Sequence, residues 1–328
     1  MVQKNHLVPP WMRLGRARAS VVKCAALGVA FGAAMLRAEV LTVATYNVEN
    51  YLAVDRRIEG IYRPAYPKPE AAKQVLRAVI RGLAADVLAL QEMGPPGYLE
   101  ELRRDLRAEG LDYPHVALAE ASDPDRHLAV ISRVPFRSVR TVADLDFSYF
   151  GAREKVKRGL LEITLAAVDG DWTLFVVHLR SRHTERLDDP ASALCRAGEA
   201  EAIRNHVLAR FPDPATARFL ILGDCNDLKD SKPLRLLARR GATPIAGLLD
   251  AADANGETWT YVYRKEDTYT RVDHILVSRG LAAAVVGGRA RIYDGPGTGG
   301  ASDHRPVAVR LQFGAGRNPA PGASLSGP

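Results

Sequence analysis

The chain has 328 residues, of which 47% are hydrophobic and 25% charged, an ordinary composition for a globular protein with a packed core. No internal repeat, heptad pattern or apolar run of bilayer length is present, which excludes solenoids, coiled coils and multi-span membrane proteins. The net charge of +7 is misleading, because six of the 45 basic residues precede the first acidic residue, Glu39. The remainder has 39 basic and 38 acidic residues, or +1, so its charge is a weak argument for nucleic-acid binding.

Residues 1–38 have the pattern of a secretory signal peptide. A basic stretch at 4–23 is followed by an Ala-rich apolar run at 25–36, which is short for a membrane span but typical of a signal core. Cleavage after Ala34 or Ala38 would export the protein to the periplasm or out of the cell. The alternatives are an uncleaved N-terminal anchor, a disordered arm, or translation from an internal methionine.

The first half of the folded part mixes strands and helices. Apolar and β-branched runs predict the strands, and apolar residues at helical spacing predict the helices. The predicted elements are a strand at 40–48, a polar loop at 54–69, a helix from Pro69 to about Leu83, a strand at 86–91, a helix at 98–109 and a strand at 128–132.

The second half continues in the same mixed order. The predicted elements are strands at 160–168 and 172–179 around a turn at Gly170, a helix at 191–210, a strand at 219–222, a helix at 233–240, and strands at 272–278 and 306–311. We expect one folded domain over 39–313 and a disordered Gly/Pro/Ala/Ser tail over 314–328. This order favours α/β layers with mixed sheets over a barrel or a Rossmann fold.

Polar and ionisable residues appear where the apolar strands end. They are Asn47, Glu49, Glu92, His178, Asp224, Asn226, Asp273, Asp303 and His304. If these strand ends converge, they form one site rich in carboxylates with two histidines. Oxygen ligands of this kind suit Mg²⁺ or Mn²⁺, and such a site suits phosphoryl chemistry with an activated water.

Six short motifs together resemble the endonuclease/exonuclease/phosphatase superfamily, from about Leu41 to Leu311. They are Thr45-Tyr46-Asn47-Val48-Glu49-Asn50, Asp86-Val87-Leu88-Ala89-Leu90-Gln91-Glu92, Val177-His178-Leu179-Arg180-Ser181, Gly223-Asp224-Cys225-Asn226, Arg271-Val272-Asp273-His274-Ile275-Leu276 and Ser302-Asp303-His304-Arg305-Pro306. The first motif is most similar to the bacterial, exported, nuclease-like branch. The resemblance implies a DNase-I-like four-layer α/β sandwich, with two mixed, mostly antiparallel sheets and helices outside.

The resemblance also implies a metal site. Glu92 would be the principal ligand, and Asn47 and Glu49 would lie near the metal because they share one strand face. Asp303 would complete the surroundings of a Mg²⁺ or Mn²⁺ ion.

The catalytic groups follow from the same resemblance. His304 would act as a general base or contact the phosphate, and Asp273 would orient it. Asp224 would position or deprotonate the attacking water, while Asn226 would donate to the phosphoryl oxygen. His178 would contact the phosphate, as in nuclease-like and sphingomyelinase-like relatives.

Four further residues are candidates for substrate contacts. Arg158 and Arg180 could bind phosphate as forks, although a solvated charge is the favoured interpretation for Arg158. Trp259 and Tyr261 could stack on a base or a headgroup, and a structural role is equally expected. The remaining histidines, His127, His183, His206 and His274, are expected to be structural or on the surface. Cys195 and Cys225 could form a disulfide in an oxidising compartment or be two buried thiols.

We therefore expect a metal-dependent hydrolase of phosphodiester bonds whose substrate is nucleic acid, acting as a monomer without a stable protein partner. The alternative is a phosphodiesterase or phosphatase for a small molecule or a lipid headgroup. A catalytically inactive binding module is a third hypothesis, and the presence of every motif residue argues against it.

Overall fold

The computed structural model describes residues 38–184 and 186–314. The predicted signal peptide and the predicted tail lie outside these residues, except for Ala38 and Gly314. Within the described part of the chain, no helix is long and apolar enough to cross a membrane.

One large sheet contains seven strands. In order across the sheet they are β16 (Ala251–Ala252), β20 (Ala290–Ile292), β21 (Val307–Phe313), β1 (Glu39–Tyr51), β4 (Val87–Met93), β6 (His127–Ser132) and β5 (His115–Ala119). β1 runs parallel to β4 and β16 to β20, while the other neighbours are antiparallel.

A second sheet contains six strands. Across the sheet they are β15 (Ala246–Leu248), β19 (Asp273–Ser278), β12 (Phe219–Asp224), β11 (Trp172–His178), β10 (Leu160–Leu165) and β7 (Phe136–Val142). Only the pair β11 and β12 is parallel among these neighbours.

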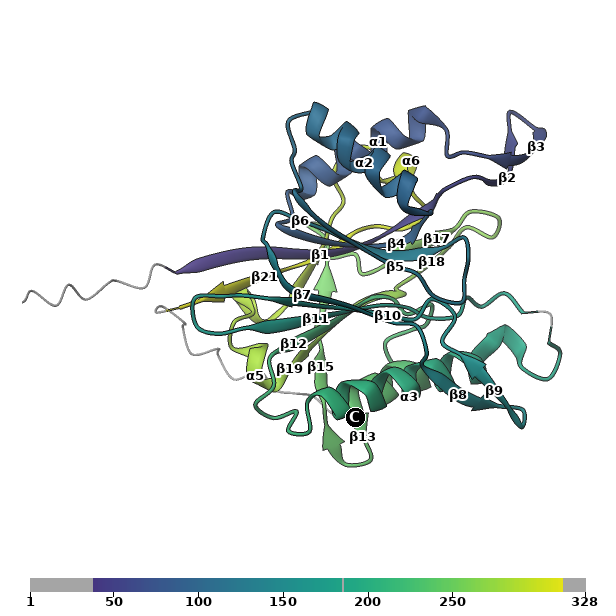
Figure 1. The fold of residues 1–328 in the computed structure, drawn as a ribbon. Helices are drawn as coiled ribbons and strands as arrows, with labels where there is room; N and C mark the ends of the chain where they lie inside the picture. Colours follow the sequence, from purple (N-terminus) through teal and green to yellow (C-terminus); the bar gives the residue numbers. More distant parts are fainter. Residues whose placement is uncertain (1–37, 185, 315–328) are drawn as a thin grey trace, which may run out of the picture. The chain divides into compact units, whose positions relative to one another are not determined.

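Helices cover the outer face of each sheet (Figure 1). Their bounds are α1 (Glu70–Leu83), α2 (Pro96–Ala108), α3 (Ala193–Arg210), α4 (Lys232–Ala238), α5 (Arg279–Ala282) and α6 (Thr298–Ala301), with 3-10 turns η1 (Pro190–Ser192) and η2 (Val286–Gly288). α1, α2 and α6 pack on the seven-stranded sheet, whereas α3 and α4 pack on the six-stranded sheet. The predicted four-layer α/β sandwich with mixed, mostly antiparallel sheets is therefore confirmed.

Alternating burial explains why these segments form strands between two apolar interfaces. On β1, Val43 packs between the sheets while Ala44 packs under the helices. On β11, Leu174 and Val176 likewise face the other sheet, while Phe175 faces α3. Because side chains alternate along a strand, every second residue of these strands points between the two sheets.

Four two-stranded hairpins lie outside the two sheets. They are β2 (Val54–Ile58) with β3 (Ile61–Tyr66), β8 (Asp146–Tyr149) with β9 (Ala152–Lys155), β13 (Arg239–Arg240) with β14 (Thr243–Pro244), and β17 (Tyr261–Tyr263) with β18 (Thr268–Thr270). The prediction of a plain polar loop at 54–69 was wrong, because β2 and β3 pair there around a two-residue turn. Both turn residues, Glu59 and Gly60, have positive φ values of 52° and 81°, as a tight hairpin turn requires.

The other predicted elements are present with end shifts of a few residues. The sequence prediction missed the four edge strands of the two sheets, β5, β7, β15 and β16, and also β20. Edge strands carry weak patterns, and β7 is exposed at most of its positions.

Candidate active site

Four predicted site residues point between the sheets, three of them at the ends of strands and Asn47 within β1. Asn47 shares its strand face with Val43 of the inter-sheet core, and His178 shares its face with Val176. Asp224 lies directly opposite His178 on one neighbouring strand and opposite Asp273 on the other. The strand register therefore sets the spacing of His178, Asp224 and Asp273.

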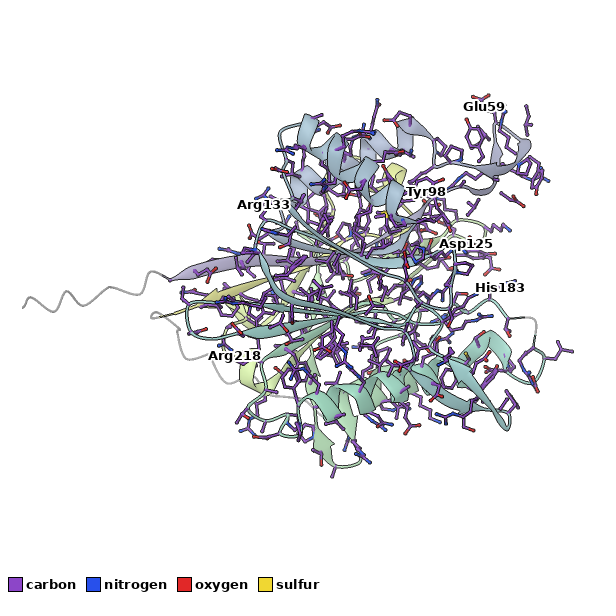
Figure 2. All side chains as sticks on the ribbon, viewed as in Figure 1. Glu59, Tyr98, Asp125, Arg133, His183 and Arg218 are labelled. Carbon is purple, nitrogen blue, oxygen red and sulfur yellow. The ribbon has the colours of Figure 1, made fainter. Side chains whose placement is uncertain are left out.

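Loops at this end of the sheets surround the strand ends. Figure 2 places Asp125 and His183 near this end and Arg133 and Arg218 near the opposite end. Asp125 precedes β6 and His183 follows β11. The loops that border the site are therefore those before β6 and after β11.

Glu92 reaches the site through a local irregularity in β4. Its φ is 61°, and the pairing of β4 with both neighbouring strands shifts register at this point. Its carboxylate accepts hydrogen bonds from Nδ2 of Asn47 at 3.3 Å and from the backbone N–H of Asn50 at 2.9 Å. Bulges and left-handed residues of this kind re-aim a side chain, and they recur at functional sites.

Asn47 joins the two sheets at the site. Its Nδ2 donates to Asp224 at 3.0 Å as well as to Glu92. Its Oδ1, the atom that could bind a cation, accepts the backbone N–H of Glu49 at 3.0 Å. In this arrangement Asn47 positions two carboxylates, and one of the two lone pairs of its Oδ1 accepts a backbone hydrogen bond.

His304 and Asp273 form a buried pair. Nδ1 of His304 lies 2.8 Å from Oδ2 of Asp273, and Ser302 fixes the loop by donating from Oγ to the carbonyl of Asn47 at 2.8 Å. Burial alone would lower the pKa of His304, but the charges of Asp273 and Asp224 outweigh it and raise the pKa well above its usual value. The ring therefore holds both protons near neutral pH and can donate from Nε2.

Asp224 and Asp303 are carboxylates with raised pKa values. Burial raises the pKa of Asp224 to about 7, against the lowering effect of the charge of His304, and the charge of Asp273 adds a smaller increase. Burial likewise raises the pKa of Asp303 to about 6, where the charges of Glu49 and Glu92 add to the effect and His304 again opposes it. Burial is the main cause in both cases, so these two carboxyl groups keep their protons to higher pH than exposed aspartates do.

His178 is buried between the two sheets. Its Nε2 lies 3.5 Å from Oδ2 of Asp224 and 4.0 Å from Oε1 of Glu92. Burial, followed by the positive charges of Arg158 and His304, lowers the pKa of His178 well below its usual value. A neutral imidazole here can donate a hydrogen bond to a phosphoryl oxygen without adding charge.

Asn226 follows β12 with a positive φ of 51°. Its Nδ2 donates to the carbonyl of Leu179 at 3.0 Å and to Asp224 at 3.2 Å, which engages both amide hydrogens. Donation to a phosphoryl oxygen, the predicted role of Asn226, requires one of these bonds to be replaced.

Among the described residues, one compact group of three side chains could hold a divalent cation, and a second, more widely spaced set lies near it. Asp224, Asp273 and His304 place their ligand atoms within 4.8 Å of one another, but the Asp273–His304 hydrogen bond already engages this group. Glu49, Glu92 and Asp303 are partly exposed, with side-chain exposures of 31%, 18% and 27%. Burial is the main cause of the raised pKa of Asp303, and the charges of Glu49 and Glu92 add to it. A cation next to these three partly exposed carboxylates would relieve both effects, so we favour them as the group that fits a cation.

The expectation that Arg158 is a solvated charge was wrong. The residue is only 7% exposed, because Nε pairs with Oδ2 of Asp123 at 3.1 Å, and its Nη1 has no partner among the described residues. Its charge acts on His178. Arg180 differs, because its hydrogen bonds to described residues are made by its main chain. Its N–H donates to Glu199, and its carbonyl accepts from Arg196.

Sequence reasoning missed Arg126 and Lys68. Nε of Arg126 donates to Oδ1 of Asn50 at 2.8 Å, and its charge acts on His178. Lys68 is 3% exposed and donates from Nζ to the carbonyl of Glu49 at 3.1 Å. Both contacts join segments far apart in the chain, so no local motif could have pointed to them.

The two aromatic candidates have different surroundings. The ring of Tyr261 lies 4.9 Å from that of His304, so the structure brings it to the site. Trp259 instead carries the guanidinium of Arg305 over its ring at 4.0 Å and donates from Nε1 to Glu257. One face of Trp259 is therefore already occupied by a neighbour within the chain.

The residues predicted to be structural lie away from the reacting groups. Cys195 and Cys225 are buried free thiols. His127 contacts the carbonyl of Ala119, His206 contacts Glu162 and His274 contacts the carbonyl of Asp227, while His183 is exposed.

The fold and these strand-end groups define the class of metal-dependent phosphoesterases. The model of the Endonuclease/Exonuclease/phosphatase family matches residues 44–304, so the chain belongs to this family. The family depends on divalent metal ions and acts on phosphate esters. No curated protein matches the sequence.

Solved structures of this fold cover most of the chain. Sphingomyelinase C from Streptomyces griseocarneus has a TM-score of 0.58 at 15% identity, over 83% of this chain and 99% of that one. The human Nocturnin catalytic domain has a TM-score of 0.57 at 14% identity, covering 85% and 98%. A 3'-5' exonuclease from Neisseria meningitidis has a TM-score of 0.51 at 17% identity, covering 83% and 100%.

Proposed function

We propose that the chain hydrolyses phosphodiester bonds of nucleic acid with the help of a Mg²⁺ or Mn²⁺ ion. The observation that carries this proposal is the 2.8 Å Asp273–His304 pair, which lies beside Asp224 at the line where the two sheets meet. Such a pair, next to a carboxylate that titrates near neutral pH, suits proton transfer during the attack of water on phosphorus.

The residues of the chain have distinct tasks in this reaction. Asp224 accepts the proton of the attacking water, and Asn47 and Asn226 hold its carboxylate by hydrogen bonds. His304, charged and oriented by Asp273, donates to a phosphoryl oxygen as negative charge develops there. A divalent ion held by Glu92, Glu49 and Asp303 would polarise the phosphoryl group when bound.

Nucleic acid is the favoured substrate for three reasons. The Thr45–Asn50 motif resembles exported nucleases, and His178 is present as in that branch. In addition, Arg126 and Arg158 place positive charge beside His178, where a phosphate backbone would pass. The free Nη groups of Arg126, which have no partner among the described residues, suit a bidentate phosphate contact.

The test uses purified residues 39–328 with Mg²⁺, Mn²⁺ or EDTA. Supercoiled plasmid, bis-(p-nitrophenyl) phosphate and sphingomyelin are offered in parallel, with His304→Ala as the inactive control. We expect metal-dependent nicking of plasmid that the variant lacks. Hydrolysis of the small diester or the lipid with intact plasmid would contradict the nuclease assignment while keeping the phosphodiesterase.

A second candidate substrate is the headgroup of a lipid, and the β2–β3 hairpin favours it. Ile61 is 58% and Tyr62 57% exposed at the end of this hairpin, which begins shortly after Asn50 of the site. Exposed apolar residues of this kind can enter a membrane surface.

The hairpin can be tested separately. Ile61→Ser with Tyr62→Ser should weaken binding to sphingomyelin vesicles if lipid is the substrate. Val168→Ser, at another exposed apolar position that is 44% exposed in the β10–β11 turn, is the matched control. Equal vesicle binding by all three proteins would remove this candidate.

We also propose export, which rests on the pattern at 1–38. Expression of the full chain with a C-terminal tag should give a shortened protein in the periplasm or medium. A full-length protein that stays with the membrane or the cytoplasm would contradict it.

A further inference from the structure

A group of exposed cations lies on α4 and the start of the following hairpin. We define the α4 basic surface as Lys232, Arg235, Arg239 and Arg240, all of which are exposed. Between 229 and 240 the chain has a single acidic residue, Asp230, against five basic ones. The folded part as a whole is nearly neutral, so this concentration of charge is local.

The cations of the α4 basic surface are not neutralised by carboxylates. Arg235 donates to the main-chain carbonyl of Asp230, and Arg239 donates to that of Gly241 at 2.8 Å. Among the described residues, none of the four forms an ion pair. Helix α2 differs, because Arg103 and Arg104 pair with acidic side chains of α2 and Arg107 pairs with Asp112 just after it.

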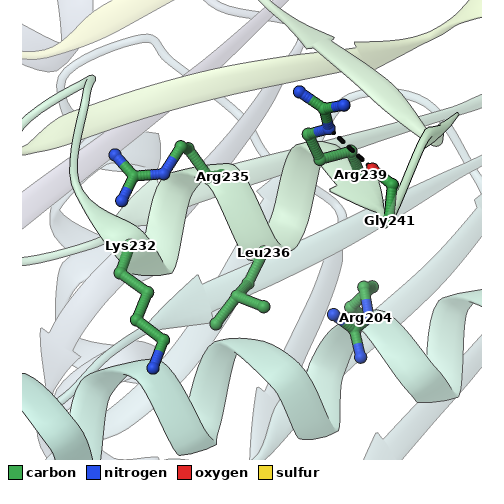
Figure 3. A pocket seen from close by; sticks show the side chains of 6 residues that line it. All are labelled: Arg204, Lys232, Arg235, Leu236, Arg239 and Gly241. Carbon is green, nitrogen blue, oxygen red and sulfur yellow. Dashed lines mark hydrogen bonds between the residues drawn. The ribbon is translucent and has the colours of Figure 1, made fainter.

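The surface borders a shallow hollow between α3 and α4. The hollow has a volume of about 300 Å³, and Figure 3 shows the side chains that line it. They are Arg204, Lys232, Arg235, Leu236, Arg239 and Gly241. Four of the six are basic and none is acidic, although Arg204 itself donates to Glu201 at 2.8 Å.

Helix α4, which carries part of the surface, packs on the fold through its inner face. Leu234 and Leu237 bury the inner face of α4 against α3. Lys232 follows Asp224 by eight residues, which limits their separation to roughly 27 Å at full extension. One turn of a B-form duplex, about 34 Å, is long enough to span that separation.

We propose that the α4 basic surface binds a stretch of phosphodiester backbone outside the active site, so that a long nucleic acid is held at two places. This inference rests on the proposed nuclease function. Guanidinium forks match phosphate oxygens, and the hollow contains one apolar side chain and no aromatic ring. The surface therefore lacks the groups that insert into a membrane or stack on bases, and its contacts are independent of sequence.

The test compares full-length proteins that carry His304→Ala, in EDTA, so that binding is measured without cleavage. One carries Lys232→Gln, Arg235→Gln and Arg239→Gln in addition. The matched control removes the same charge from α2 with Arg103→Gln, Arg104→Gln and Arg107→Gln. Binding of a labelled 30-base-pair duplex is followed by fluorescence anisotropy between 50 and 200 mM salt, and the same substitutions are assayed in the active protein on bis-(p-nitrophenyl) phosphate.

The α4 variant should bind the duplex at least about tenfold more weakly, and the slope of log K against log salt should shrink by about one for each phosphate that the substituted side chains no longer neutralise. The α2 variant should bind as its parent does, and both should hydrolyse the small diester normally. Equal weakening in both variants, or none in the α4 variant, would overturn the proposal. So would weaker binding to phosphatidylglycerol vesicles without a change for duplex.

Failure of the proposed nuclease function would look different. Active protein that hydrolyses the small diester but leaves plasmid intact would contradict that function alone. The anisotropy comparison would still decide whether the α4 basic surface binds nucleic acid.

Discussion

Asp273 receives the hydrogen bond from Nδ1 of His304, and its other oxygen, Oδ1, has no partner among the described residues. The carboxylate is fully buried, and the backbone N–H of Asp273 donates to Oγ1 of Thr260 at 3.1 Å. Its negative charge is the main reason why His304 keeps its proton. A neutral side chain of the same shape would therefore change the charge of the site but little of its geometry.

Asp273→Asn should accordingly reduce kcat by about 10²- to 10⁴-fold, as expected when the residue that orients and charges a catalytic histidine is neutralised. The histidine should also lose its raised pKa, which an NMR titration of His304 would show. The kcat values are measured with bis-(p-nitrophenyl) phosphate and Mg²⁺, and the NMR titration is made on the protein without substrate.

A matched control uses the pair His206–Glu162, which lies on the outer face of the six-stranded sheet. Nε2 of His206 is 3.2 Å from Oε2 of Glu162. Glu162→Gln should leave kcat within about twofold of the parent when compared for equal amounts of folded protein. Equal decreases in both variants would show that neutralising either buried histidine–carboxylate pair lowers kcat, which would contradict a specific role of Asp273.

Asp123 anchors both arginines beside His178. Its Oδ1 accepts the backbone N–H of Arg126 at 3.1 Å, and its Oδ2 accepts Nε of Arg158 at the same distance. Burial alone would raise the pKa of Asp123, but these hydrogen bonds and the charge of Arg158 outweigh it and lower the pKa. A carboxyl group with a lowered folded-state pKa stabilises the fold above its unfolded pKa, and this stabilisation is lost as pH falls through the folded-state value.

Asp123→Asn should therefore lower the free energy of unfolding at pH 7, by about 3 kcal/mol if Arg158 remains buried without a partner. The difference between parent and variant should become smaller as pH falls below about 4, the usual pKa of an unfolded aspartate. Urea unfolding at several pH values measures this. A difference that is independent of pH would contradict the assignment.

At the scale of elements, close contact between β11 and β12 sets the position of Asp224. Gly223, just before it, has a φ of 147°, and a Cβ atom there would lie 1.9 Å from the carbonyl oxygen of Val177. Any side chain at this position would push the two parallel strands apart. The spacing of His178 and Asp224 thus depends on a residue that has no side chain.

Gly223→Ala should destabilise the protein by well over 1 kcal/mol and reduce activity, because the conformation and the contact are both incompatible with Ala. Gly60→Ala is the matched control, since its φ of 81° is also positive but no atom lies within 4 Å of the added Cβ. Urea midpoints and kcat are compared for the two variants. The prediction fails if Gly223→Ala is no more harmful than Gly60→Ala.

The sequence predicted the strands that carry the site because their patterns are strong. β1, β11, β12 and β19 are apolar on both faces, and each has a polar residue where the pattern stops. Period-two alternation then shows which residues share a face with the inter-sheet core. The six motifs indicated the DNase-I-like fold, whereas the order of strands and helices alone indicated only α/β layers with mixed sheets.

The remaining features depend on contacts that a sequence pattern does not contain. β2 and β3 contain no buried residue, so no apolar face marks them in the sequence, and the pair Glu59–Gly60 was the local turn signal. Arg158 is buried because it meets Asp123, 35 residues away. Arg126 reaches the site through Asn50, across 76 residues.

On the scale of the whole molecule, the site spans two sheets that each contribute carboxylates. Asn47 and Glu92 come from one sheet, and Asp224 and Asp273 come from the other. Without a cation, repulsion among these groups and Asp303 opposes the packing of the sheets at this end. A bound divalent ion should therefore stabilise the entire fold.

Thermal unfolding should shift upward as Mg²⁺ or Mn²⁺ is added and reach about 2.7 kcal/mol of stabilisation when the ion is at a hundred times its Kd. Glu92→Gln should remove most of this shift, whereas Glu100→Gln on the exposed face of α2 should not. A shift that survives Glu92→Gln would place the ion elsewhere, with the Asp224, Asp273 and His304 group as the next candidate.

The pairing of β1 with β21 brings the two ends of the folded part together, since Glu39 lies opposite Phe313. Asn47 is eight residues further along β1, roughly 27 Å away at the rise of a strand. A surface or fusion partner attached at either end of the folded part would therefore lie at the end of β1 opposite the active site, and the site would stay accessible. The same proximity permits circular permutation, with a short peptide joining 313 to 39 and new termini opened at the Glu59–Gly60 turn.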